Sequence, residues 1–357
     1  MHVPLSPSEL PGAPAPVDLR SDTVTRPTRE MYAVMQSAPI GDDGLDFDPS
    51  VRELEQTVAM RLGKDAGLFV PSCTMANFLA VLAQVGRNEQ VVLESNAHMY
   101  TSERGSATFT GAFFLGVAGT SGAMDLDALE EATAGGKHKL RTALIAMETS
   151  HNNAGGAVLP LVHMQAVHAH AQARSIPVHL DGARLFNAAV ALGVAVDQVA
   201  AHADTVSLCL SKGLSAPVGA VLSGSQTVIE RARGLRRMLG GTQRQAGIMA
   251  AAGRYAVEHM SARLSEDHAR AKRLSSLLNA LNPCLSASTP DSNIVQVDVS
   301  KTGSSSAQWS AALEAAGLLA RPWGATRLRC VTHRHIADDD IERAVASFNT
   351  VLNTLRA

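Results

Sequence analysis

The sequence predicts an α/β fold in which helices wrap a mostly parallel β-sheet. Short apolar runs alternate with longer helical patterns from about residue 17 to about residue 252. The clearest of these runs are almost continuously apolar, as is typical of parallel strands that are buried on both faces. Both observations favour a large sheet that lies inside its helices.

Three strands stand out, each after a helical pattern. We expect them at residues 141–148, 176–181 and 205–211, which read "RTALIAME", "IPVHLD" and "TVSLCLS". The preceding helices read "LDALEEATA", "LVHMQAVHAHAQAR" and "AAVALGVAVDQVAAH". This order is typical of successive parallel strands whose carboxyl ends meet at one edge of a sheet.

The remainder of the chain predicts a smaller second domain. A helical region runs from Gly247 to about residue 280. Three strand candidates follow it ("SNIVQVDV", "GLLARP" and "TRLRCVTH"), and then a closing helix, "DDDIERAVASFNTVLNTLR". We expect a flexible, proline-rich tail at residues 1–17, a large domain at residues 18–252 and a small α+β domain at residues 253–357.

Composition narrows the class of protein. The chain has 357 residues, of which 46% are hydrophobic, and its net charge of -2 predicts neither a nucleic acid nor a membrane partner. Four scattered cysteines indicate reduced thiols and no zinc site. The N-terminus lacks a signal-peptide pattern, so we expect a cytoplasmic protein that acts on a small molecule.

Charged residues follow the three strands. Glu148 ends the first, Asp181 ends the second and Lys212 follows the third. Ligands of open parallel sheets bind beyond these ends. An aspartate and a lysine at one edge form either a buried salt bridge or a Schiff-base site, in which the aspartate keeps a pyridine nitrogen protonated.

A second candidate site precedes a predicted helix in "FVPSCTMANFLAVL". Ser72, Cys73 and Thr74 offer backbone N–H groups and a hydroxyl to a phosphate. The same residues also suit an ordinary helix N-cap.

These motifs carry a family resemblance. "DLRSDTVTRPTREM", "GDDGLDFDPSV", "FVPSCTMAN", "SNAHMY", "METSHNNAGGAVLP", "HLDGARLFNA", "LSKGLSAPVG", "GGTQRQAG" and "LRCVTH" resemble, in order and spacing, the low-specificity L-threonine aldolases. That family implies a pyridoxal phosphate (PLP) enzyme of fold type I. We then expect a large domain with a seven-stranded, mostly parallel sheet and a small C-terminal α+β domain.

The resemblance implies a set of cofactor-binding residues. Lys212 would bind PLP covalently, Asp181 would pair with the pyridine nitrogen, and His98 would stack on the ring. Cys73 and Thr74 would hold the phosphate. No metal is expected.

Substrate-binding residues follow in the same way. Ser21, Arg184 and Arg329 would bind the substrate carboxylate, with Arg184 also counted among the residues around the cofactor. His151 would lie over the β-hydroxyl group, and either His98 or His151 would be the base.

The resemblance also implies a homo-oligomer with active sites shared between subunits: a twofold dimer at least, and usually a tetramer that is a dimer of dimers. Arg237 and Arg244 would reach the phosphate of the neighbouring subunit's cofactor.

Several positions depart from the family. Cys73 and Ser215 replace glycines, and Leu45 and Asp46 replace the usual tyrosine and glycine in a loop. The acidic residues of this loop would either bind a cation or, as we favour, cap helices and meet solvent.

The expected reaction is retro-aldol cleavage of L-threonine, L-allo-threonine and related L-β-hydroxy-α-amino acids to glycine and an aldehyde. The alternatives are a β-eliminating lyase or an aminotransferase of the same fold, or a degenerate homologue that binds PLP without turnover.

Overall fold

The computed structural model describes residues 15–355 and contains two compact units. The larger comprises residues 26–264, and the smaller combines residues 15–25 with residues from Ser265 onward. Of the tail expected at residues 1–17, residues 1–14 lie outside the described part of the chain. Val17, by contrast, is a buried residue of a strand.

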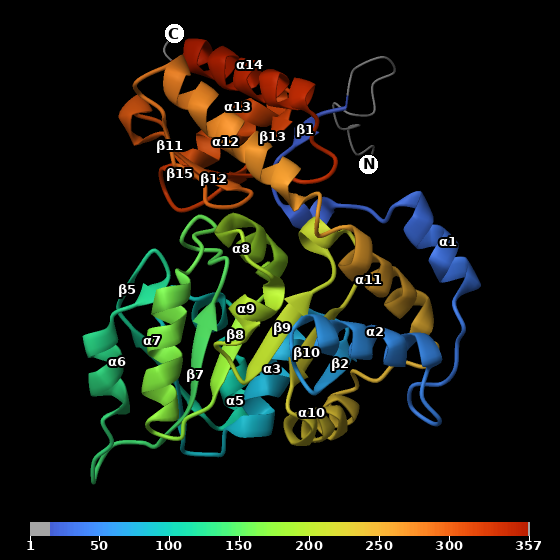
Figure 1. Cartoon of the computed structure of the whole chain (residues 1–357). Coiled ribbons are helices and arrows are strands. Elements are labelled where there is room, and N and C mark those ends of the chain that lie inside the picture. The colour runs from blue at the N-terminus through green and yellow to red at the C-terminus, as the bar shows by residue number, and fades with distance from the viewer. Residues whose placement is uncertain (1–14, 356–357) are drawn as a thin grey trace, which may run out of the picture. The chain divides into compact units, whose positions relative to one another are not determined.

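The larger unit is built on a seven-stranded sheet (Figure 1). All its strands are parallel except β10, which runs antiparallel to both neighbours. The order in space is β2 (Ala66–Val70), β10 (Ala220–Gly224), β9 (Thr205–Cys209), β8 (Val178–Gly182), β7 (Thr142–Glu148), β3 (Gln90–Glu94) and β4 (Phe113–Val117). The predicted α/β class and the three predicted strands are confirmed.

Side chains on the two faces of this sheet enter different cores. In β3, Val92 joins one cluster, whereas Val91 and Leu93 join another. This two-sided burial explains why the strands are apolar throughout.

The helices of this unit are α1 (Arg29–Ser37), α2 (Pro49–Arg61), α3 (Cys73–Gln84), α4 (His98–Thr101), α5 (Ser106–Thr110), α6 (Leu126–Thr133), α7 (Leu161–Gln172), α8 (Leu185–Leu192), α9 (Val196–Ala200), α10 (Gln226–Met238) and α11 (Gly247–His259). A short hairpin, β5 (Gly119–Thr120) and β6 (Ala123–Met124), precedes α6.

Two helical regions differ from the expectation. The helix expected before β9 is divided into α8 and α9, because Gly193 ends α8 with a left-handed φ of 67°. The region after Gly247 also forms two helices, α11 and α12 (Leu264–Leu281). Because α11 packs on α1 and α2, it belongs to the larger unit, and a domain boundary after residue 252 would divide this helix.

The smaller unit has an antiparallel sheet of four strands and its own apolar core around Trp309 and Phe348. Its N-terminal strand β1 (Val17–Asp18) pairs with β13 (Leu318–Leu319), which explains why residues 15–25 belong to this unit. The sheet order is β11 (Ser286–Ala287), β12 (Ile294–Asp298), β15 (Arg327–Val331) and β14 (Arg321–Pro322). The other elements are η2 (Asp22–Val24), η4 (Ser300–Thr302), α13 (Ser306–Ala315) and α14 (Asp338–Thr354). No helix among residues 15–355 has the length and apolar character to span a membrane.

Candidate active site

The carboxyl edge of the large sheet collects charged side chains. Glu94 ends β3 and Glu148 ends β7, while Asp181 lies next to the end of β8 and opposite Glu148 in the register. Lys212 begins a short helix, η3 (Lys212–Leu214), which follows β9. The parallel strands thus bring these residues to one edge, as the sequence order predicts.

Asp181 is a buried carboxylate that is held by hydrogen-bond donors. Asn77 Nδ2 donates to Asp181 Oδ2 at 2.8 Å, and the Ala183 backbone N–H donates to Oδ1 at 3.1 Å. Within the described residues, Asp181 makes no ion pair, although it is only 3% exposed. A buried carboxylate of this kind fits a protonated pyridine nitrogen, which would supply the missing positive charge.

A second layer of polar side chains fixes the Asn77 amide. Its Oδ1 accepts from Ser207 Oγ at 2.7 Å and from His179 Nε2 at 3.1 Å. Burial lowers the pKa of His179 to about 4, so the ring is neutral, and Thr205 Oγ1 lies 3.0 Å from its Nδ1. The amide therefore turns its N–H groups toward Asp181.

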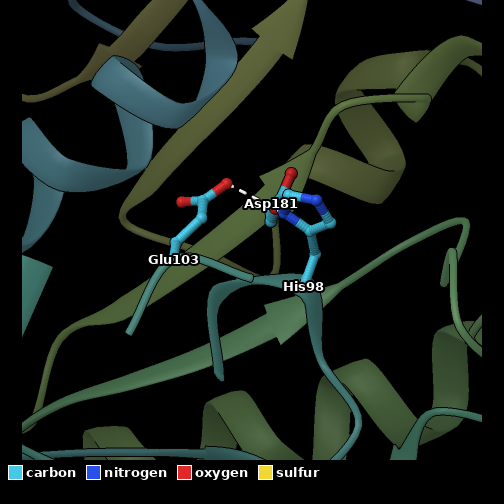
Figure 2. Close-up of side chains that lie close together, drawn as sticks. All are labelled: His98, Glu103 and Asp181. Atoms are coloured by element: carbon cyan, nitrogen blue, oxygen red, sulfur yellow. Dashed lines mark hydrogen bonds and ion pairs between the residues drawn. The ribbon is translucent and has the colours of Figure 1, made fainter. Parts of the chain in front are cut away.

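His98 lies beside this carboxylate. One ring nitrogen of His98 and one oxygen each of Glu103 and Asp181 lie within 4.8 Å of one another, and Figure 2 shows the three side chains together. His98 Nδ1 lies 2.9 Å from Glu103 Oε1, and the side chain of His98 is 37% exposed. Sequence reasoning missed Glu103. The sequence feature that could have indicated it is the short spacing in "HMYTSE", where the glutamate comes five residues after the histidine.

His151 has a different environment. It is fully buried, its Nε2 lies 3.2 Å from Glu94 Oε2, and its Nδ1 accepts a hydrogen bond from the Ala154 backbone N–H. Although burial acts to lower it, the pKa of His151 is raised by the hydrogen bond to Glu94 and by nearby carboxylates. Both ring nitrogens are thus engaged inside the protein.

Glu148 organises the two segments that carry these histidines. Its carboxylate accepts the backbone N–H of His98 at 2.5 Å and that of Asn152 at 2.7 Å. Burial raises the pKa of Glu148. Arg184, which is buried just before α8, donates to Asn152 Oδ1 at 3.4 Å, so it lies close to the same segment.

Cys73 and Thr74 begin α3. Ser72 caps this helix, because its Oγ accepts a hydrogen bond from the Met75 N–H, as the N-cap interpretation predicts. The N-terminus of the helix is also suited to binding an anion. Thr74 Oγ1 donates to Glu103 Oε1 at 3.2 Å. Cys73 does not have a positive φ, so its side chain causes no backbone strain, whereas Lys212 and Ser215 have φ values of 63° and 66°.

The other predicted residues lie in the smaller unit or at and beyond the end of α10. Ser21 caps η2, and Arg329 on β15 is buried, with Nη2 donating to the Arg20 carbonyl at 3.3 Å. Both lie in the smaller unit, so their role in binding substrate stays a prediction. Arg237 lies in the last turn of α10, and Arg244 pairs with Asp42 at 3.3 Å.

The acidic loop has protein partners. Asp48 caps α2 and also accepts the backbone N–H groups of Gly41 and Gly247. Asp43 forms a buried ion pair with Arg236 at 2.7 Å. These contacts account for the carboxylates of Asp43 and Asp48 without a bound cation.

Comparison with known proteins assigns the chain to a family. Residues 18–302 match the model of the beta-eliminating lyase family. Low-specificity L-threonine aldolase 1 of Arabidopsis thaliana is 37% identical over 95% of this chain and 97% of its own length. Among solved structures, Leishmania major threonine aldolase has a TM-score of 0.78 at 16% identity, covering 96% of this chain and all of its own. SPT with PLP has a TM-score of 0.75 at 18% identity and covers 96% of this chain and 88% of its own, which at this identity shows a shared fold. The chain belongs to the beta-eliminating lyase family, together with the low-specificity L-threonine aldolases.

Proposed function

We propose that this protein is a PLP-dependent carbon–carbon lyase that cleaves L-threonine, L-allo-threonine and related L-β-hydroxy-α-amino acids to glycine and an aldehyde. The observation that carries the proposal is Asp181, a buried carboxylate that is held by Asn77 Nδ2 at 2.8 Å and makes no ion pair among the described residues. Bound PLP supplies an electron sink for bond cleavage at Cα, provided that its ring nitrogen stays protonated.

The residues of the larger unit divide the work of binding. Asp181 would hold the ring proton, Lys212 would provide the amine that binds the cofactor, and His98 would cover the ring. Cys73 and Thr74 offer the N-terminus of α3 to the phosphate.

His98 is the better candidate for the proton acceptor. Its side chain is 37% exposed, whereas His151 is fully buried with both nitrogens engaged. A base must reach the proton that it removes. We therefore assign removal of the β-hydroxyl proton to His98, and assign to His151 the task of fixing the segment after β7. Arg184 binds the substrate carboxylate through its guanidinium group.

The active form is a homo-oligomer, most simply a dimer of dimers. Arg237 and Arg244, at and beyond the end of α10, are the residues that we assign to a neighbouring subunit's cofactor phosphate. All four cysteines are free thiols, which supports the cytoplasm as its location.

The test is product analysis with purified protein, added PLP and L-threonine, L-allo-threonine or L-phenylserine. We expect glycine and the matching aldehyde in equal amounts, and a visible absorbance band in the resting enzyme. Lys212→Ala should lose both the cleavage activity and the absorbance band. Dialysis against EDTA should leave the rate unchanged.

Other products would identify the alternatives. Ammonia with a keto acid would indicate β-elimination, and amino-group exchange with a keto acid would indicate transamination. A coloured protein that releases no glycine from any of the three substrates would overturn the aldolase assignment.

A further inference from the structure

Glu103 contacts three other side chains of the site: His98, Thr74 and Asn77. It lies between α4 and α5, and its side chain is only 7% exposed. Besides its contact with His98, its carboxylate accepts from Thr74 Oγ1 at 3.2 Å and from Asn77 Nδ2 at 3.3 Å. Because Asn77 Nδ2 also donates to Asp181, one amide group connects the two carboxylates.

The contact with Glu103 decides which nitrogen of His98 carries the proton. An ionised carboxylate only accepts hydrogen bonds, so His98 Nδ1, at 2.9 Å from Glu103 Oε1, is the protonated nitrogen. Nε2 then holds the lone pair. It has no hydrogen-bond partner among the described residues, and the side chain is partly exposed, so Nε2 is the atom that can receive a proton.

Glu103 also changes how readily the His98 ring takes up a proton. Its hydrogen bond and its negative charge raise the pKa of His98, although burial acts in the opposite direction. Asp181 from β8 and Glu148 from β7 face the same ring, and their charges raise its pKa further. Of these three carboxylates, Glu103 alone bonds the ring, while Glu148 accepts the backbone N–H of His98.

We propose that Glu103 is a positioning residue that holds the Nδ1–H tautomer of His98 and turns Nε2 toward the substrate. The inference rests on the proposed function. The β-hydroxyl proton passes from oxygen to Nε2, and the imidazolium that results is stabilised by the Glu103 carboxylate. The O–H electron pair becomes the carbonyl of the aldehyde, and the Cα–Cβ pair stays with the glycine fragment.

Two substitutions separate the charge of Glu103 from its geometry. Glu103→Gln keeps an oxygen that can accept from Nδ1 but removes the negative charge, whereas Glu103→Ala removes both. Glu89→Gln is a matched control, because Glu89 precedes the amino end of β3, at the opposite edge of the sheet, and pairs there with Arg141.

The first readout needs neither cofactor nor substrate. In the cofactor-free protein, the His98 ring is titrated by NMR and assigned, among 13 histidines, by the signal lost in His98→Asn. We expect a lower pKa in Glu103→Gln and no change in Glu89→Gln. An unchanged His98 titration in Glu103→Gln would overturn the proposal even if the enzyme cleaves threonine.

The second readout is the pH dependence of kcat/KM at saturating PLP. The acid limb, where His98 loses its proton, should move to lower pH in Glu103→Gln. Glu103→Ala should lower kcat by about tenfold to a hundredfold, as expected for a misplaced catalytic group, with a smaller change in KM. An acid limb that does not move would contradict a positioning role. If wild-type protein releases no glycine, the proposed function fails, but the NMR result still decides whether Glu103 controls His98.

Discussion

Asn77 on α3 holds Asp181 on β8 through a hydrogen bond of 2.8 Å between Nδ2 and Oδ2. The same amide accepts from His179 and Ser207, so a single neutral side chain orients the buried carboxylate at the centre of the site. Asn77 was not among the residues expected from the sequence, since an asparagine within a helix has no distinctive pattern.

Asn77→Ala should therefore weaken cofactor binding and destabilise the fold. It removes one donor from Asp181 and leaves two buried donors without an acceptor, which should lower the free energy of unfolding by about 1 to 3 kcal/mol. Visible-absorbance titration with PLP and urea unfolding of the cofactor-free protein measure the two effects. Gln84→Ala on the same helix is the control, because Gln84 bonds Thr205 and not Asp181. Equal PLP affinities in the two variants would contradict the assignment.

Ser215 occupies a conformation that suits glycine. Its φ is 66°, and its buried Oγ has no hydrogen-bond partner among the described residues. Ser215→Gly should raise the free energy of unfolding by about 1 kcal/mol, because it removes the left-handed strain of a Cβ atom. Ser175→Gly tests the same argument at an exposed position, where φ is 53°, and should also raise the free energy of unfolding. If Ser215→Gly is no more stable than the wild type in urea, the strain argument is wrong.

The sequence predicts the sheet and its reactive edge well, because strand burial and strand order are both local patterns. Asp181 and Lys212 could be found for this reason, since each lies at or after the end of an apolar strand. Partners that are placed by a loop, or that come from separate segments of the chain, could not be found in this way. Glu103 reaches His98 only because of a loop between α4 and α5. The burial of His151 depends on Glu94, which is 57 residues away in sequence.

Cys73 causes no backbone strain, so its effect should be chemical. The neighbouring thiol of Cys73, with the charge of Lys212, lowers the pKa of Cys209 to about 6, although burial acts to raise it. In Cys73→Gly the pKa of Cys209 should rise, and its reaction with iodoacetamide at pH values near 7 should slow. Mass spectrometry of the cofactor-free protein locates the labelled thiol, and Cys284→Ser controls for the cysteine of intermediate exposure outside the site. An unchanged rate at Cys209 would show that the two thiols do not interact.

His179 makes the stability of the fold dependent on pH. Burial lowers its pKa from the usual 6.5 to about 4. Between these values the unfolded chain binds a proton that the folded chain does not, so the free energy of unfolding should fall by a few kcal/mol as the pH decreases from about 6.5 to about 4. Above pH 6.5 this contribution is fully present.

Urea unfolding at pH values from 7.5 down to 4.5 measures this slope. His179→Gln should be less stable at neutral pH and should lose less stability on acidification. Some slope should remain, because burial also lowers the pKa of His268, in the smaller unit, to about 4. His138→Gln, at an exposed turn, should behave as the wild type does. An identical slope in His179→Gln and the wild type would mean that the His179 ring takes up its proton in the folded chain as readily as in the unfolded one.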